Sequence, residues 1–184
     1  MIQDNSGIFD IKITRSLKRR KTIGAQLINN ILHVYAPYTI SDEKLDKIIV
    51  SFKQRFQNSL LKKRLNNEKP LKEIAEILNK KYLKNRLDIS SISIEYVTGQ
   101  THKFGCCNYR DRSIRISHQI AKMPDWVRDY VIMHELSHLI EPNHSKAFWD
   151  IVSEYKLAER AKGYLIAKGM ELHDNNNETE GGKI

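Results

Sequence analysis

The sequence predicts an α+β protein, because strand-like and helix-like segments occur in separate blocks instead of alternating regularly along the chain. Residues 8–14 alternate between apolar and polar side chains, which is typical of a strand with one buried face. Residues 41–64 and 71–83 place apolar side chains at helical spacing. Strand-like segments return within residues 89–117, and helical segments follow them. We therefore expect a small N-terminal sheet, a helical connection, and a second sheet packed on later helices.

The N-terminal region is predicted to contain a β-hairpin followed by a long helix. Residues 22–27 and 31–35 have strand character, and Asn29 and Asn30 between them suit a tight turn. Ser41 is a favourable cap for the helix, whose first turn is acidic and whose end is basic.

The long helix is expected to be broken by Asn66, Asn67 and Pro70. This interruption predicts a division of the chain. Residues 1–66 would form a basic N-terminal subdomain of β-hairpin plus helix, and residues 67–172 would form a separate core.

The core is predicted to begin with a helix over residues 71–83 and a strand over residues 89–97. Residues 104–110 and 113–117 then form a hairpin, so we expect a small antiparallel sheet. A last helix is expected over residues 156–170.

A histidine pair with a glutamate beside it is the most informative motif. His134 and His138 are four residues apart, so on a helix their imidazoles lie on one face and can bind one metal ion. Glu135 sits to one side of the pair, where it can reach a metal-bound water without being a ligand. Residues 126–140 lack Gly and Pro and are mostly apolar, which predicts a largely buried helix. The alternative is a pair of hydrogen-bonded core histidines.

A third metal ligand is predicted at His144. Pro142 pushes the residue before it out of helical geometry, so the helix should end there. Asn143 or Ser145 can cap a new helix. A chain that reverses at this corner can return His144 to the metal bound by His138. Three protein ligands and one water are the layout of a catalytic zinc site.

The two cysteines are candidates for a fourth ligand. Cys106 and Cys107 are adjacent in a predicted strand and so face opposite sides, which fits a core cysteine better than a ligand pair. Adjacent cysteines also cannot build a disulfide framework, which favours a reducing compartment.

The chain has no apolar run of membrane-spanning length and no basic-then-apolar signal layout at its start, so we expect a cytoplasmic protein without membrane contact. Residues 173–184 are polar and are expected to be disordered.

The net charge of +9 is unevenly distributed, because the basic excess lies in the first two thirds of the chain. Its densest cluster is Lys18, Arg19, Arg20 and Lys21. Such a patch can make nonspecific contact with nucleic acid, and a solvated hairpin turn explains it equally well. No aromatic residues are interleaved with the cluster, so sequence-specific recognition of bases is not indicated.

The motif and its surroundings resemble the YgjP-type metallopeptidase-like family of small zincins, which is more distantly similar to SprT-like proteases acting on DNA-associated proteins. The resemblance is most specific over residues 129–149 and extends to about residue 170. It rests on His134 to Leu139, Asn143, His144, Ser145, Phe148 and Trp149, with weaker support from Asp129, Tyr130, Val131, Gly105, Cys107, Ile114, Ile116 and residues 15–22.

The resemblance implies zinc ligands at His134, His138 and His144, a catalytic Glu135, and a minimal zincin-like core. It also implies that a strand beside the metal helix holds the substrate backbone. Residues 114–117 are the candidate for that edge strand, and an ordinary paired strand is the alternative.

These observations predict a zinc-dependent peptidase that acts on a peptide or protein, with Glu135 as general base. Two other classes stay open at this point. One is a nucleic-acid-associated, SprT-like protease, and the other is a non-catalytic module in which the metal only holds the last helices together. The group that stabilises the oxyanion is not identified by the sequence; the polar residues considered are His118, Tyr109, Arg110 and Tyr155.

Overall fold

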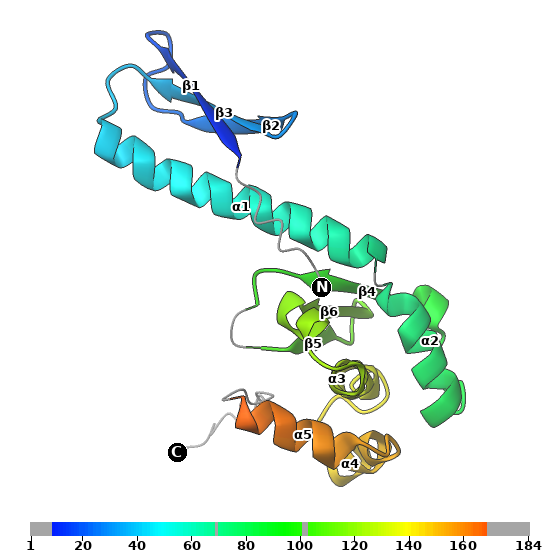
Figure 1. The fold of residues 1–184 in the computed structure, drawn as a ribbon. Coiled ribbons are helices and arrows are strands. Elements are labelled where there is room, and N and C mark those ends of the chain that lie inside the picture. Colours follow the sequence, from blue (N-terminus) through cyan, green and yellow to red (C-terminus); the bar gives the residue numbers. More distant parts are fainter. Residues whose placement is uncertain (1–8, 69, 101–102, 169–184) are drawn as a thin grey trace, which may run out of the picture. The chain divides into compact units, whose positions relative to one another are not determined.

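The structure is a computed structural model that describes residues 9–68, 70–100 and 103–168. The chain divides into two compact units, and the division falls between Lys63 and Arg64, inside the longest helix (Figure 1). Each unit has its own three-stranded sheet, and the fold is α+β as predicted. The expected tail, residues 173–184, lies outside the described residues.

The first unit contains a mixed sheet of strand order β1-β3-β2. Strand β1 (Asp10–Ser16) pairs parallel to β3 (Ile31–Pro37), and β2 (Gly24–Ile28) pairs antiparallel to β3. The turn between β2 and β3 has positive φ angles of 49° at Asn29 and 62° at Asn30. Asparagine tolerates this conformation well, so the predicted tight turn is confirmed and its chemical reason is evident.

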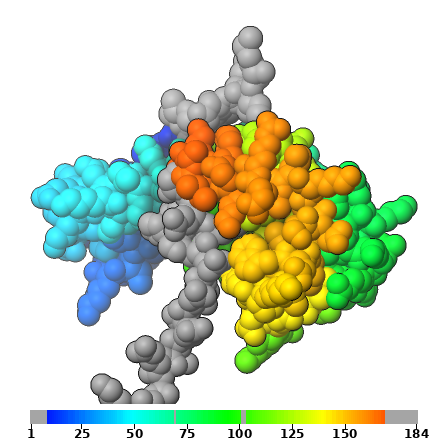
Figure 2. All heavy atoms as spheres, turned by 90° about the horizontal axis from the view of Figure 1, so that it is seen from below, coloured from blue at the N-terminus to red at the C-terminus, as the bar shows by residue number. Residues whose placement is uncertain are grey.

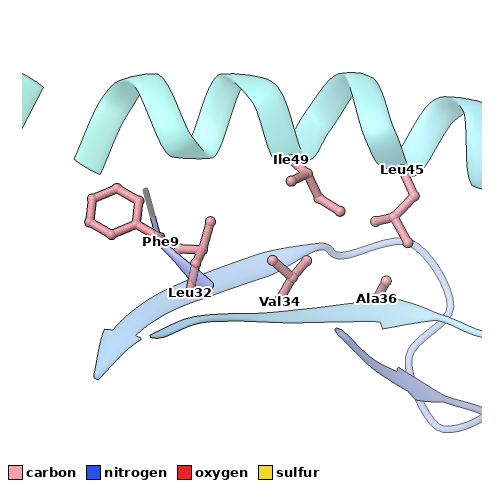
Figure 3. Close-up of a cluster of buried hydrophobic side chains, with 6 residues drawn as sticks. All are labelled: Phe9, Leu32, Val34, Ala36, Leu45 and Ile49. Atoms are coloured by element: carbon pink, nitrogen blue, oxygen red, sulfur yellow. The ribbon is translucent and has the colours of Figure 1, made fainter. Parts of the chain in front are cut away.

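Helix α1 (Asp42–Glu68) covers one face of this sheet with its N-terminal half. Figure 3 shows Leu45 and Ile49 of α1 pointing toward Leu32, Val34 and Ala36 of β3. The three β3 residues are two positions apart and the two α1 residues are four apart. These spacings place them on one face of the strand and on one face of the helix, respectively. Full burial of an aliphatic side chain of this size contributes about 1.5–3 kcal/mol, so this layer forms the core of the unit.

The predicted interruption by Asn66, Asn67 and Pro70 is confirmed, because α1 ends at Glu68, although both asparagines still lie in its last turn. The side chain of Asn66 binds the backbone of Tyr96 on both sides: its Nδ2 donates to the carbonyl at 3.1 Å, and the Tyr96 amide donates to its Oδ1 at 2.8 Å. A tertiary contact therefore uses the amide that would otherwise compete with the helical backbone. Pro70 does interrupt the chain, and it caps the next helix, α2 (Leu71–Tyr82).

The second unit contains a mixed sheet of strand order β4-β6-β5. The predicted hairpin is present, with β5 (Gly105–Asn108) antiparallel to β6 (Ser113–Ser117). Strand β4 (Ser93–Val97) pairs parallel to β6, so the sheet is mixed and not antiparallel throughout. The short helix η1 (Ile89–Ser91) precedes β4, because the Asp88 side chain accepts the Ser90 amide and starts a turn where a strand was expected.

Of the two interpretations of residues 114–117, the edge strand is wrong and the ordinary paired strand is confirmed, because β6 is paired on both sides. Its Ile114 and Ile116 are fully buried, and a strand with such residues gains most from the central position. The edges of this sheet are β4 and β5.

Three helices complete the second unit: α3 (Asp125–Ser137), α4 (Lys146–Ser153) and α5 (Ala158–Ala167). The short helix η2 (His118–Lys122) connects β6 to α3. Helix α3 packs against β5 and β6 and is covered by the other helices of this unit, so the predicted buried helix is confirmed. Figure 2 shows α4 and α5 in orange beside the yellow segment that follows α3. Among the described residues, no helix is both long and apolar enough to span a membrane.

Candidate metal centre

The C-terminal end of α3 carries the first two histidines. The α-helix ends at Ser137, and His138 is its C-cap residue. The chain then continues as hydrogen-bonded turns, with the Glu141 amide 2.8 Å from the Ser137 carbonyl. The regular helix is therefore shorter than the expected residues 126–140, because Pro142 forces the chain to leave helical geometry and the last turn tightens before it.

The third histidine is brought back by the start of α4. Ser145 is the cap of that helix, and its Oγ accepts the Phe148 amide at 3.3 Å. Of the two predicted caps, Ser145 is thus the one that the structure uses. His144 directly precedes this cap, and its Nε2 lies 3.3 Å from Nε2 of His134. One potential ligand atom from each of His134, His138 and His144 lies within 4.8 Å of the others, so the three could hold a metal ion.

The separation of these nitrogens fits the chemistry of a shared metal. Two nitrogens that each lie about 2.0–2.1 Å from one zinc ion at a tetrahedral angle are about 3.3–3.4 Å apart. The observed Nε2–Nε2 distance between His134 and His144 is 3.3 Å. A hydrogen bond between two imidazoles explains that one pair, whereas a shared ion also explains why His138 converges on the same point. In the described part of the chain, no Cys, Asp or Glu joins the group, which leaves a coordination position for water.

Backbone groups orient the His138 ring. Its Nδ1 lies 3.1 Å from the carbonyl oxygen of Pro142, and a carbonyl can only accept, so Nδ1 carries the proton. The lone pair is then on Nε2, which is the tautomer that a metal requires. Pro142 therefore both ends the helix and supplies the acceptor for a ligand.

The protonation state of His134 also suits a ligand. Burial lowers the pKa of His134 to about 3, and its two neighbours His138 and His144 act in the same direction. The imidazole is therefore neutral at physiological pH, which is the form that binds a metal.

One phenylalanine contacts all three imidazoles. Phe148 of α4 is fully buried, and its ring centroid lies 4.9 Å from that of His134, 4.5 Å from that of His138 and 4.6 Å from that of His144. Trp149 stacks on His144 with a centroid distance of 5.6 Å. These apolar rings restrict the orientation of each imidazole, because a buried ring in close contact cannot rotate freely.

Glu135 of α3 is buried, and its side chain lies against Gly105 of β5. Its side chain is only slightly exposed, and burial raises the pKa of Glu135 to about 8, while the positive charge of Lys103 acts in the opposite direction. The pKa of Cys107 rises to about 12, chiefly by burial and further through the negative charge of Glu135. A nearby divalent cation favours the ionised form of a carboxyl group, so a bound metal would lower the pKa of Glu135.

A comparison with protein families identifies the family of this chain. Residues 37–156 match the model of the YgjP-like metallopeptidase domain. The chain is a member of the YgjP-like family. Among solved structures, the metallopeptidase zymogen of Pyrococcus abyssi abylysin is similar at 15% sequence identity, over 55% of this chain and 97% of that one, with a TM-score of 0.48. No curated protein matches the chain.

Other residues that the sequence analysis names in this YgjP-like chain differ in burial and bonding. Cys106 is exposed and Cys107 is half-buried, which agrees with their predicted opposite orientation, and neither joins the histidine group. The hydroxyl of Tyr155 donates to the Trp126 carbonyl at 3.0 Å. Tyr109 is about half exposed.

The basic cluster lies in the first unit, in the connection from β1 to β2. The Arg19 guanidinium lies 5.6 Å from the centre of the Tyr35 ring. Arg20 and Lys21 line a surface pocket of about 330 Å³ together with Lys44. A second explanation for this charge is thus partial packing on the sheet, and contact with nucleic acid stays a prediction.

Proposed function

We propose that this YgjP-like chain is a zinc-dependent peptidase whose metal is held by His134, His138 and His144 and whose general base is Glu135. The observation that carries the proposal is the convergence of three imidazoles, two of them with ring nitrogens 3.3 Å apart, together with a buried carboxyl group on the residue that follows His134. A non-catalytic metal module would need neither an open coordination position nor a buried acid next to it.

The residues have separate roles in the proposed reaction. A zinc ion at this site would supply Lewis acidity toward the scissile carbonyl and make a water molecule more acidic. Glu135 accepts a proton from the attacking water and delivers it to the nitrogen of the leaving amine. The imidazoles of the three histidines are held by Phe148 and by the Pro142 carbonyl, so the site needs little rearrangement before the reaction.

Removal of the metal is expected to abolish peptide cleavage. The purified chain should contain about one zinc ion per molecule by mass spectrometric metal analysis, and 1,10-phenanthroline should stop the cleavage of unfolded casein. Added zinc should restore it, because three neutral imidazoles rebind the ion.

The control is 1,7-phenanthroline, whose nitrogens cannot chelate one ion, and which should leave cleavage intact. A chain that holds no zinc, or that cleaves casein equally well after complete removal of the metal, would contradict the proposed function. A chain that holds zinc but cleaves no unfolded protein would favour the non-catalytic module.

Substitution of Phe148 by alanine is expected to weaken zinc binding by about 10- to 100-fold, which is the usual effect of losing a partner that orients metal ligands. The reason is that one ring restrains all three imidazoles. Competition of the protein with a chromogenic zinc chelator measures the affinity. Because Phe148 is also a core residue, the folded fraction must be measured by circular dichroism on the same samples. The matched control is Phe52→Ala, a partly buried phenylalanine of the first unit; an equal loss of affinity in both variants would show that Phe148 has no special role.

A further inference from the structure

Gly105 in β5 lies against the side chain of Glu135. A Cβ atom added at Gly105 would be 2.6 Å from Cδ of Glu135 and 2.7 Å from its Cγ, and closer still to Oε1. Real Cβ atoms essentially never approach other atoms this closely. The φ angle of Gly105 lies outside the left-handed region, so its backbone conformation is open to any residue. What position 105 requires is therefore space for Glu135, and not the conformational freedom of glycine.

Neither side of this contact can easily retreat. On the helix side, Met133 and Leu136 flank Glu135 and are fully buried, so α3 is held by its neighbours. On the strand side, β5 is bonded to β6, and the Ser117 amide donates to the Phe104 carbonyl at 2.7 Å, one residue before Gly105. The overlap would also begin at Cγ, so a rotation of the carboxyl group alone does not remove it.

We propose that Gly105 is a positioning residue for the reaction of the preceding subsection: its missing side chain leaves the space that the Glu135 carboxyl group occupies, and so fixes where this proposed general base lies. This inference rests on the proposed function. A methyl group at position 105 displaces the carboxyl group while leaving the histidines in place, because the rings of His134, His138 and His144 pack on Phe148 of α4.

A double-mutant cycle tests the shared space without reference to turnover. The variants are Gly105→Ala, Glu135→Asp and the two combined, and the readout is thermal unfolding of the full chain. Gly105→Ala should lower Tm by roughly 2–10 °C, the usual effect of overpacking a tight core. In the Glu135→Asp background the same substitution should cost much less, because aspartate is one methylene shorter and vacates the space that the methyl group needs. Gly163→Ala is the matched control, because a Cβ there meets nothing within 4 Å, and it should not lower Tm.

Metal content and peptide cleavage are measured on the same samples. Gly105→Ala should keep its zinc and lose about 10²-fold in kcat, which is the scale expected for a misplaced reacting group. Additive Tm changes, or full turnover in Gly105→Ala, would overturn the inference. If Gly105→Ala does not fold, recovery of folding in the double variant supports the shared space, and failure of the double variant to fold overturns it.

The two proposals can fail separately. Absence of cleavage by the wild-type chain together with coupled Tm changes would remove the catalytic function and, with it, the positioning role, while leaving the close packing of positions 105 and 135 established. Cleavage by the wild-type chain with uncoupled Tm changes would remove only the role of Gly105.

Discussion

Replacement of Glu135 by glutamine is expected to leave the zinc content unchanged and to lower kcat by roughly 10²–10⁴-fold, the contribution typical of general acid–base catalysis. Glutamine has nearly the same size and shape, so it fits the buried space against Gly105 and keeps α3 intact. An amide cannot accept the proton of the attacking water at neutral pH. The proposed zinc ligands are His134, His138 and His144, and the substitution changes none of them. Metal analysis and steady-state kinetics on a fluorogenic peptide measure the two quantities.

The matched control for this substitution is Glu154→Gln. Glu154 is exposed at the end of α4, so the same chemical change there should affect neither the metal nor kcat. Normal turnover in Glu135→Gln would remove Glu135 from the mechanism. Loss of zinc from Glu135→Gln would instead indicate that its carboxylate is a ligand.

Substitution of His144 by alanine is expected to lower zinc affinity by more than the 10- to 100-fold that follows from loss of an outer hydrogen-bond partner, because a direct ligand is removed. His144 comes from the segment before α4, so its loss would also remove the link that the proposed metal makes between α3 and α4. Cleavage should fall with the zinc content. The measurement is a chelator competition titration, with thermal unfolding in the presence and absence of added zinc. A ligand that binds only the folded state raises Tm, and this increase should be much smaller in the variant.

His33→Ala provides the comparison. His33 is a partly buried histidine in β3 of the first unit and does not belong to the three-histidine group. Its substitution should leave the affinity and the zinc-dependent increase in Tm unchanged. An unaltered affinity in His144→Ala would show that the site consists of His134 and His138 with other ligands, and the proposed centre would have to be abandoned.

Local features of this chain were predictable because their causes lie within a few residues. The Asn29–Asn30 turn follows from the tolerance of asparagine for positive φ, and the start of α4 follows from the Ser145 side chain, which accepts the Phe148 amide. The spacing of His134 and His138 predicts a shared helix face in the same way. Ring centroids 5.0 Å apart agree with that expectation.

Features that depend on distant parts of the chain were wrong or missing. Strand β6 is central because it also pairs with β4. The two strands are separated in the chain by β5, so the local sequence pattern does not predict this pairing. The two hydrogen bonds between the Asn66 side-chain amide and the Tyr96 backbone join residues 30 positions apart, so no local pattern predicts them. Gly105 did carry a signal, since a glycine within a strand often marks a close approach of another group. That signal does not say which group approaches.

The sequence by itself therefore determined the elements, the α+β class and the residues of the candidate site, because helix periodicity, capping and ligand spacing are short-range properties. Only the tertiary structure decided that Phe148 contacts all three imidazoles, that the Pro142 carbonyl orients His138, and that Glu135 occupies the space above Gly105. The physical reason is that side-chain packing is set by which buried surfaces meet, and many pairings of the same elements satisfy the same local pattern.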